Sequence, residues 1–240
     1  KMQGCGNDYI YVNCFEEKID DPSALAVRLS DRHYGIGSDG LILIEPSEKA
    51  DAYMHMFNAD GSEGRMCGNG IRCVAKYIYD HALIHPDRRH AVIDTLSGLK
   101  EVRFAVCEKK VTSVTVDMGI PHLTGSHAET VSICGKAVRF IGVDTGNPHA
   151  VVFLEDNIVP LKLFAKGEDT SADLRPYLAD LDIEEPGTAM EQSERFPDGV
   201  NTEFICFVSR KEICMRVWER GSGETFACGT GATASVYAGI

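Results

Sequence analysis

The sequence predicts an α+β fold of two pseudo-symmetric, similarly folded α/β domains, each a mainly antiparallel sheet around a central helix. Three observations lead to this fold class. The length of 240 residues corresponds to one large or two small domains. Strand-like segments outnumber helical ones and do not alternate with them as in a doubly wound parallel sheet. One strand–loop–helix pattern occurs twice, once in each half of the chain.

The first 83 residues contain the clearest local patterns. Aromatic and β-branched residues predict a strand over 8–14, and a proline in the first turn opens a predicted helix over 22–31. The short apolar run 41–44 predicts a buried strand, and the alternation over 52–58 predicts another. Apolar residues at helical spacing predict a helix over 71–83.

From residue 90 onward the pattern changes to short strands. These are predicted over 91–95, 102–107, 111–118, 130–133, 138–143 and 150–154. A helix is predicted over 171–181, after an acidic loop, and a hairpin from 203–209 and 212–218. A Gly-rich segment then leads into a final predicted helix.

Two Cys-Gly-x-Gly loops carry the repeated pattern. Cys67 opens one loop and Cys228 the other, and each loop leads into a predicted helix. An aromatic residue lies ten positions before each cysteine, and a glutamate lies four positions before it. Equal spacing in the same context indicates a divergent internal repeat rather than coincidence. A turn at 119–121 lies between the repeats and divides the chain into predicted domains 1–118 and 119–240.

Composition and charge exclude several kinds of partner. The 24 Lys and Arg against 36 Asp and Glu give a net charge of −12, which argues against a nucleic acid or an anionic membrane. The apolar runs are far shorter than a membrane span, and no signal peptide opens the chain. We therefore expect a cytoplasmic protein whose nine cysteines are reduced, most of them as small core residues.

The two cysteine loops have the chemistry of a proton-transfer site. Free backbone N–H groups and the helix dipole stabilise a thiolate at a helix N-terminus. A thiolate and a thiol facing each other supply a base and an acid together, as inversion at a carbon centre requires. The same N-termini offer donors to a substrate carboxylate. Cys67 and Cys228 are therefore candidate acid–base residues.

Other interpretations of the motifs fit less well. No Cys-x-x-Cys and no His-Glu-x-x-His is present, so neither a zinc site nor a redox motif of the usual spacing is indicated. We expect neither a metal nor a cofactor. The segment 35–40 fits G-x-G-x-x-G, but it follows a helix and precedes a strand, the reverse of a dinucleotide site, and we interpret it as a turn. A thiol switch built from Cys67 and Cys228 remains an alternative function.

The ordered motifs resemble those of the diaminopimelate epimerase family over essentially the whole chain. They are Gly6-Asn-Asp8, Asp31-Arg-His33 with Gly35-Ile-Gly37, Phe57-Asn-Ala-Asp-Gly-Ser-Glu63, Met66-Cys-Gly-Asn-Gly-Ile-Arg72, Gly146-Asn-Pro-His149, Gly199-Val-Asn201, Trp218-Glu-Arg220 and Ala227-Cys-Gly-Thr-Gly231. The resemblance implies epimerisation of LL- to meso-diaminopimelate without pyridoxal phosphate, in lysine and peptidoglycan precursor biosynthesis. It also implies an active site in the cleft between the domains, a homodimer, and further strands after the final helix.

The resemblance also implies roles for individual residues. Cys67 and Cys228 match the two acid–base thiols, with the polar residues His149 and Glu219 beside them. The positions that hold the reacting α-carboxylate match Gly68, Asn69, Gly229 and Thr230. The positions that bind the distal amino-carboxylate end match Asn58, Asn147, Asn201 and Arg220, and Asn7 matches a further substrate contact. Arginine can hold a carboxylate through two hydrogen bonds, and asparagine offers a donor and an acceptor together.

Two positions depart from the family pattern. Gly40 stands where many members carry a glutamine that contacts substrate, which leaves open a related isomerase acting on another amino acid. Cys5 stands where an aliphatic residue is usual, and we expect it to serve packing.

Overall fold

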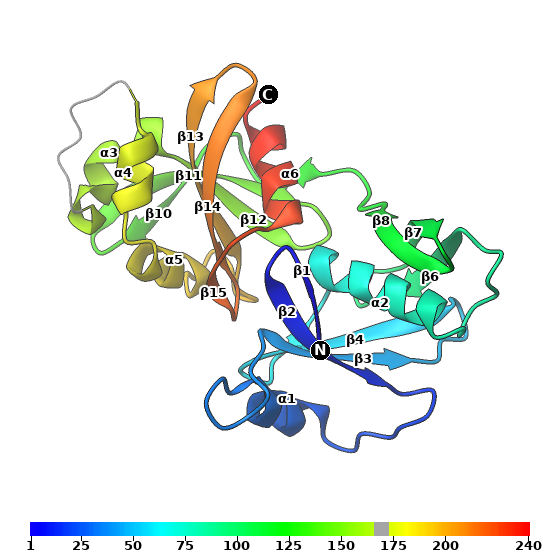
Figure 1. Cartoon of the computed structure of the whole chain (residues 1–240). Helices are drawn as coiled ribbons and strands as arrows, with labels where there is room; N and C mark the ends of the chain where they lie inside the picture. The colour runs from blue at the N-terminus through cyan, green and yellow to red at the C-terminus, as the bar shows by residue number, and fades with distance from the viewer. Residues whose placement is uncertain (166–172) are drawn as a thin grey trace. The chain divides into compact units, whose positions relative to one another are not determined.

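The computed structural model describes residues 1–165 and 173–240. The chain divides into two units, Lys1–Met118 and Gly119–Ile240. Figure 1 draws them from the blue N-terminus to the red C-terminus. Each unit contains one mixed sheet with helices against its faces, and the two are described in turn.

The first unit is built on an eight-stranded sheet. Its strands are β1 Met2–Gly4, β2 Asn7–Asn13, β3 Gly40–Glu45, β4 Ala52–Asn58, β5 Glu63–Gly64, β6 His90–Asp94, β7 Lys100–Cys107 and β8 Lys110–Val116. They lie in the order β1-β2-β3-β4-β6-β7-β8, and β5 pairs with β4. The pairs β2–β3 and β4–β6 are parallel, whereas the other pairs are antiparallel.

Two helices cover the faces of this sheet (Figure 1). Helix α2, Gly68–Asp80, lies against one face, and helix α1, Pro22–Ser30, against the other. Side chains of β3 alternate between the two cores: Ile42 packs in the core under α2, and Leu41 in the core under α1. The alternation explains why residues 41–44 of β3 are all apolar.

The second unit is built on a seven-stranded sheet. Its strands are β9 His122–Leu123, β10 Glu129–Ile133, β11 Lys136–Asp144, β12 Pro148–Phe153, β13 Asn201–Ser209, β14 Glu212–Glu219 and β15 Gly223–Thr225. They lie in the order β10-β11-β12-β13-β14-β15, and β9 pairs with β11. Of the strand pairs described in this unit, β12–β13 is parallel and the others are antiparallel.

Helices again cover both faces of the second sheet (Figure 1). Helix α6, Gly229–Ala238, lies on one face, where Ala234 packs with Ile205 of β13. The other face carries α3 Leu154–Leu161, the 3₁₀ turn η1 Lys162–Phe164, α4 Arg175–Asp180 and α5 Glu184–Glu191. Phe204 of β13 belongs to the larger core on that side.

Most predicted elements are present, with small shifts at their ends. The predicted strands and the two helices of the first unit are found within a few residues of the expected positions. Helix α2 begins three residues before the predicted start at residue 71, because the cap and first turn are glycine-rich and polar. Of the helix predicted over 171–181, residues 171 and 172 lie outside the described residues, and α4 occupies 175–180. Helices α3 and α5 were not predicted.

The internal repeat is visible in the strand register. Phe57 of β4 pairs with Glu63 of β5, and Trp218 of β14 pairs with Glu224 of β15. Each short hairpin leads directly into the cysteine loop and its helix. The same aromatic–glutamate pair therefore lies in the same cross-strand position before both loops.

Six of the nine cysteines are buried or packed against an apolar core, as predicted for most of them, and three are exposed. Apart from the two loop cysteines, only Cys73 and Cys206 are buried, and all nine are free thiols. The exposed cysteines are Cys5, Cys107 and Cys134. Cys5 and Cys134 have positive φ, 56° and 48°, because they lie in hairpin turns, where no core forms around a side chain.

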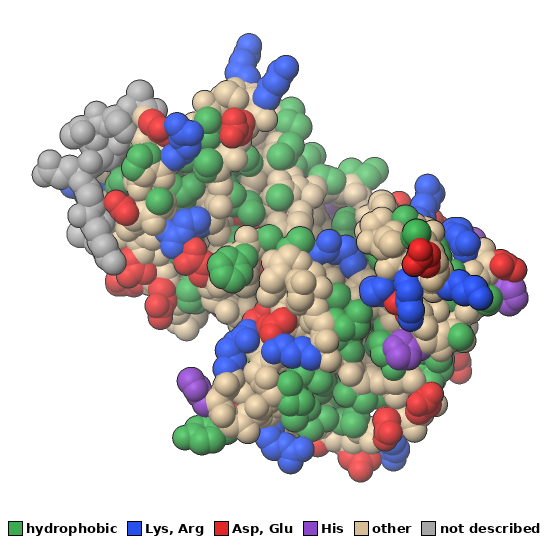
Figure 2. All heavy atoms as spheres, in the orientation of Figure 1, with side chains coloured by type: hydrophobic (Ala, Val, Ile, Leu, Met, Phe, Trp, Pro, Cys, Tyr) green, Lys and Arg blue, Asp and Glu red, His purple; other side chains and the backbone are tan. Residues whose placement is uncertain are grey.

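Charged side chains of both signs are mixed on the surface, and the glycine-rich segment is a turn. On the face drawn in Figure 2, Lys and Arg side chains lie interspersed with Asp and Glu rather than in one basic patch. In the described part of the chain, no helix combines the length and apolar character needed to cross a membrane. The segment 35–40 is a turn and bend that leads into β3, as interpreted from the sequence.

Candidate active site

Both loop cysteines are the N-cap residues of their helices. Cys67 precedes α2 with φ −130° and ψ 115°, and Cys228 precedes α6 with φ −124° and ψ 112°. Each sulfur accepts a hydrogen bond of 3.3 Å from the backbone N–H three residues later, from Gly70 and Gly231 respectively. A thiolate is a better acceptor than a thiol, and the helix dipole adds to this preference. The two thiols therefore have the same backbone environment.

Close packing holds the glycine that donates to each sulfur. A Cβ on Gly70 would lie 2.7 Å from Cδ1 of Ile42, and a Cβ on Gly231 would lie 2.4 Å from Oε1 of Glu203. Each helix thus approaches its sheet at a point where an added Cβ would force a neighbouring side chain to move. The donor amide is placed by contact with β3 in the first unit and with β13 in the second.

In the first unit, Asn7 connects Cys67 to a carboxylate. The Cys67 thiol donates to Oδ1 of Asn7 over 3.2 Å, and Nδ2 of Asn7 donates to Asp39 over 2.8 Å. Asn7 is buried at the start of β2. The Asp39 carboxylate accepts from the amide nitrogen of Asn7, so the amide oxygen of Asn7 faces the sulfur. We call Cys67, Asn7 and Asp39 the first half-site.

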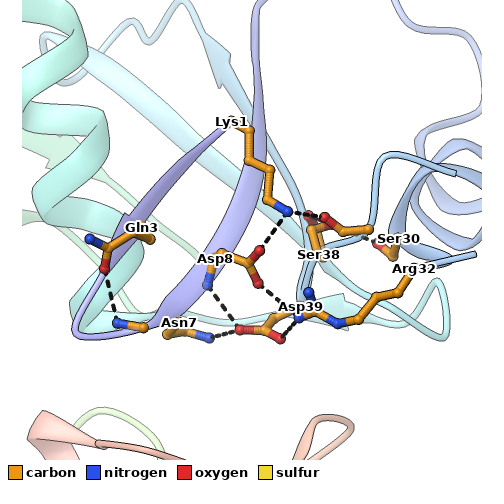
Figure 3. Close-up of polar contacts among 11 residues, drawn as sticks. Lys1, Gln3, Asn7, Asp8, Ser30, Arg32, Ser38 and Asp39 are labelled. Carbon is orange, nitrogen blue, oxygen red and sulfur yellow. Dashed lines mark hydrogen bonds and ion pairs between the residues drawn. The ribbon is translucent and has the colours of Figure 1, made fainter.

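A network of ion pairs holds Asp39 in place (Figure 3). Arg32 donates to Asp39 over 2.8 Å and to Asp8 over 2.9 Å, and Lys1 pairs with Asp8 over 2.7 Å. The Asp8 backbone N–H also donates to Asp39, over 2.9 Å. Burial raises the pKa of Asp8, but hydrogen bonds and charges of Arg32 and Lys1 outweigh it and lower that pKa below its usual value. The network holds the Asp39 carboxylate in place beside Asn7.

The remaining predicted residues of the first unit lie around the same loop. Gly68 and Asn69 form the first turn of α2, and Oδ1 of Asn69 accepts a 2.6 Å hydrogen bond from Arg72. Asn58 is buried at the end of β4 and donates to Ser62 over 2.9 Å. All three are therefore placed at or near the cysteine loop by secondary structure.

In the second unit, Cys228 is buried among acidic groups. Burial, together with the charges of Glu219 and Glu203, raises the pKa of Cys228 well above its usual value. Thr230, in the first turn of α6, lies 3.2 Å from the sulfur. Burial also raises the pKa of Glu219, whose carboxylate accepts a hydrogen bond from Thr225. Cys228 is consequently a thiol at neutral pH.

A buried imidazole–carboxylate pair lies beside this thiol. Nδ1 of His149 is 2.7 Å from Oε1 of Glu203, and both side chains are 0% exposed. Nε2 of His149 is 3.1 Å from Oδ1 of Asn147, which also accepts from Thr145. We call Cys228, His149, Asn147, Glu203 and Glu219 the second half-site.

Three groups of the second half-site carry possible metal ligands. Donor atoms of His149, Glu203 and Cys228 all lie within 4.8 Å of one another. The direct 2.7 Å hydrogen bond between two of these groups accounts for their grouping without an ion. We interpret the cluster as a proton-transfer group.

Arg220 and Asn201 lie together at the edge of the second half-site. Oδ1 of Asn201 accepts from the backbone N–H of Arg220 over 2.9 Å, and the guanidinium donates to the carbonyl of Asp198 over 2.5 Å. A Cβ on Gly199 would lie 2.6 Å from Cδ of Arg220, so the arginine stem crosses directly over that glycine. An ion pair between Arg220 and Glu219 is not found among the described residues.

Gly229 and Gly40 differ in what surrounds them. A Cβ on Gly229, at the first position of α6, would meet nothing within 4 Å. A Cβ on Gly40 would lie 2.2 Å from the carbonyl oxygen of Phe57, so this backbone admits no side chain there. Gly40 is therefore explained by strand packing, and it no longer indicates a different substrate.

Sequence reasoning missed Asp39 and Glu203. Asp39 lies within the glycine-rich segment 35–40, whose pattern predicts only a turn. Glu203 lies inside a predicted strand, and only a comparison of the two repeats would have exposed a charged residue at a buried strand position.

Two matching thiols, each capping a helix in a mixed-sheet unit, are the site of an isomerase of the racemase and epimerase class. The fold is shared with solved structures at low sequence identity. A hydroxyproline epimerase from Agrobacterium vitis aligns with a TM-score of 0.67 at 15% identity, over 98% of this chain and 73% of that one. A PhzF-family protein from Bacillus anthracis aligns with a TM-score of 0.60 at 17% identity, over 99% of this chain and 76% of that one.

Sequence comparison gives the family. Residues 1–124 and 141–240 match the family described as Diaminopimelate epimerase. Curated diaminopimelate epimerases from Agathobacter rectalis and Desulfovibrio desulfuricans are 47% and 46% identical, over 100% and 99% of this chain and 82% and 81% of their own lengths. The chain belongs to the diaminopimelate epimerase family.

Proposed function

We propose that this chain interconverts LL- and meso-diaminopimelate, with Cys67 and Cys228 as base and acid on opposite faces of one α-carbon. Family membership supports the substrate. The observation that carries the mechanism is the matching N-cap geometry of the two thiols, each with its sulfur 3.3 Å from a helix amide. No cofactor is needed, because the two thiols supply both proton transfers.

The proton transfers balance over one turnover. A thiolate removes the α-proton and becomes a thiol, and the opposite thiol gives its proton to the other face and becomes a thiolate. Two protonation forms of the enzyme, one with Cys67 as the thiolate and one with Cys228 as the thiolate, take the two isomers. The enzyme that has released product has the opposite protonation and is ready for the reverse reaction.

Charge that develops on the α-carbon spreads into the α-carboxylate. The first N–H groups of a helix have no partner within the helix and can donate to that carboxylate. In this role we place Gly68, Asn69, Gly229 and Thr230. Such donors act most strongly on the charge that develops in the transition state.

The distal amino-carboxylate end needs donors and acceptors of both kinds. In this role we place Asn58, Asn147, Asn201 and Arg220, whereas Asn7 makes a further substrate contact. Arg220 can hold the distal carboxylate through two hydrogen bonds. Its backbone is bonded to Asn201 and its guanidinium to Asp198, which limits its freedom before substrate binds. His149 and Glu219 support the Cys228 thiol rather than binding the distal end.

The cellular setting follows from the reaction. Meso-diaminopimelate is the form used in lysine and peptidoglycan precursor synthesis, and we place the protein in the cytoplasm, acting as a homodimer. We also propose that residues 1–118 and 119–240 are the two epimerase domains, each supplying one thiol.

Incubation with LL-diaminopimelate in deuterated water tests the reaction type and the substrate together. We expect meso product with deuterium at the inverted α-carbon. Faster exchange on glutamate, proline or aspartate would support a related isomerase with another substrate. Dithiol–disulfide turnover without α-proton exchange would support the thiol switch and overturn the proposal.

A further inference from the structure

Strand register makes the two half-sites comparable position by position. In the first unit, Tyr9 of β2 pairs with Gly40 of the parallel strand β3. In the second unit, His149 of β12 pairs with Asn201 of the parallel strand β13. Both pairs lie at the start of the strand that leads into the following hairpin. Tyr9 and His149 therefore occupy equivalent positions in the repeat.

The same register relates Ile42 to Glu203. Each lies two residues beyond the paired position on the central strand, Ile42 after Gly40 and Glu203 after Asn201. Helix packing confirms the match independently. Ile42 is the side chain that the Cβ of Gly70 would meet, and Glu203 is the side chain that the Cβ of Gly231 would meet. Both glycines hold the third position after their cysteine.

Two neighbouring positions of the repeat are thus filled by chemically different residues in the two units. In the first unit, Tyr9 and Ile42 belong to the apolar core under α2, at 3% and 0% exposure. In the second unit, the equivalent His149 and Glu203 form a hydrogen-bonded pair at 1% and 0% exposure. A buried pair of this kind can often be replaced by apolar residues without loss of stability. The first unit shows that this fold does not need the charge.

One carboxylate oxygen of Glu203 is buried without a hydrogen-bond partner among the described residues. Its Oε1 lies against His149, whereas its Oε2 is buried without a hydrogen-bond partner in the described structure. An unsatisfied buried oxygen costs free energy. Selection for stability alone would remove it, so a function of the second half-site must account for it.

We propose that Glu203 is a positioning residue that holds His149 in one tautomer and orientation beside Cys228. The proposal rests on the proposed epimerase function and adds an asymmetry to it. A carboxylate at Nδ1 takes that N–H and determines how Nε2 meets Asn147. Cys228 therefore has a titratable partner oriented by a buried carboxylate. Cys67 instead has Asn7, an amide that cannot take up a proton.

The charged groups that face Cys228 come from three elements. Glu203 lies on β13, His149 on β12, and Glu219 at the end of β14. Glu203 and Glu219 both disfavour a thiolate, and removal of either charge should ease ionisation of the thiol. A variant at Glu203 leaves the carboxyl of Glu219 in place, so only part of the effect of nearby charge on the Cys228 thiol is removed.

Glu203→Gln is the principal test, since it preserves size against Gly231, removes the charge and replaces one carboxylate oxygen by an amide nitrogen. We expect kcat to fall by about 10- to 100-fold with little change in KM, because a misplaced imidazole loses part of its contribution to proton transfer. Cys228 should be alkylated by iodoacetamide at lower pH than in the wild type, with the site identified by peptide mass spectrometry. The ¹⁵N shifts of His149 should report loss of the Nδ1–H tautomer.

Ile42→Val is the matched control at the equivalent position of the first unit. It should lower stability and leave the Cys228 alkylation profile and the His149 shifts unchanged. Glu203→Ile combined with His149→Tyr copies the first unit into the second. That double variant should fold with a melting temperature no lower than the wild type and lack epimerase activity.

Several outcomes would overturn the role of Glu203. They are an unchanged kcat in Glu203→Gln, unchanged His149 shifts, or an alkylation profile that moves equally in Ile42→Val. A double variant that fails to fold would show that the pair is structural. If the wild type exchanges no α-proton of diaminopimelate, the proposed function fails, and the His149 shifts and Cys228 alkylation still decide the role of Glu203.

Discussion

Asp39 turns the carbonyl end of the Asn7 amide toward Cys67. Nδ2 of Asn7 is held by the Asp39 carboxylate at 2.8 Å, and Oδ1 is left 3.2 Å from the thiol. An asparagine alone could present either end to the sulfur. Held in this orientation, Oδ1 of Asn7 accepts a hydrogen bond from the Cys67 thiol. The same oxygen cannot donate to a thiolate.

Asp39→Asn removes that constraint, because the new amide can donate or accept. We expect kcat to fall by roughly tenfold, about the effect of one misplaced polar contact in a proton-transfer site. Steady-state kinetics in both directions would measure it. Asp8→Asn is the matched control. It weakens ion pairs with Arg32 and Lys1 in the same network but leaves the contact between Asn7 and Asp39 in place. An equal loss in both variants would assign the effect to the ion-pair network instead.

Cys67→Ser and Cys228→Ser separate the capping role of each residue from its chemistry. Serine is among the preferred N-cap residues, so we expect both variants to fold with near wild-type stability. Epimerisation should fall by at least about 10³-fold in each, because a hydroxyl is a poor acid and base near neutral pH. Cys107→Ser, at an exposed cysteine, is the control. Full activity in either Cys67→Ser or Cys228→Ser would contradict the two-thiol mechanism.

Glu219→Gln should change how stability depends on pH. Burial raises the Glu219 pKa above its usual value of 4.5, so the folded protein binds this proton more tightly than the unfolded chain. The resulting stabilisation is present below the unfolded pKa and is lost as pH rises through the raised folded pKa. We expect the variant to gain stability over the wild type between acidic and neutral pH in urea unfolding. A pH-independent difference would contradict this.

Gly231→Ala should destabilise the second unit. The new Cβ would lie 2.4 Å from Oε1 of Glu203, a contact that forces the buried carboxylate to move. Overpacking of this kind costs about 1–3 kcal/mol. Gly229→Ala, where a Cβ meets nothing within 4 Å, should leave stability equal or slightly higher. Thermal unfolding of the pair would measure the difference, and equal melting temperatures would exclude the close contact.

The strands and the two cysteine loops could be predicted because short stretches of neighbouring residues determine them. The aromatic and β-branched runs, the helical spacing after Cys67 and the paired Cys-Gly-x-Gly loops each lie within a short window. Helices α3 and α5 escaped detection because each contains a proline, Pro160 and Pro186, and the second also contains Gly187. Those residues normally mark helix ends, and tertiary packing overrode them.

The site residues that were missed depend on contacts distant in sequence. Asp39 reaches Asn7 across 32 positions, and Glu203 reaches His149 across 54. Nothing near either residue in the sequence marks it as different from a turn aspartate or a strand glutamate. The three exposed cysteines could not be told apart from the core cysteines for a related reason. Composition alone does not distinguish a hairpin turn from a core strand.

Use of a sulfur atom as a helix cap ties covalent modification of the site to local unfolding. Cys67 and Cys228 each hold the amide three residues later, and an alkylated sulfur is a weaker acceptor for that N–H. An inhibitor that captures one thiol should therefore loosen the first turn of its helix while the opposite helix stays intact. Hydrogen–deuterium exchange at the amides of Gly70 and Gly231 would reveal which thiol a compound has reached, without any measurement of turnover.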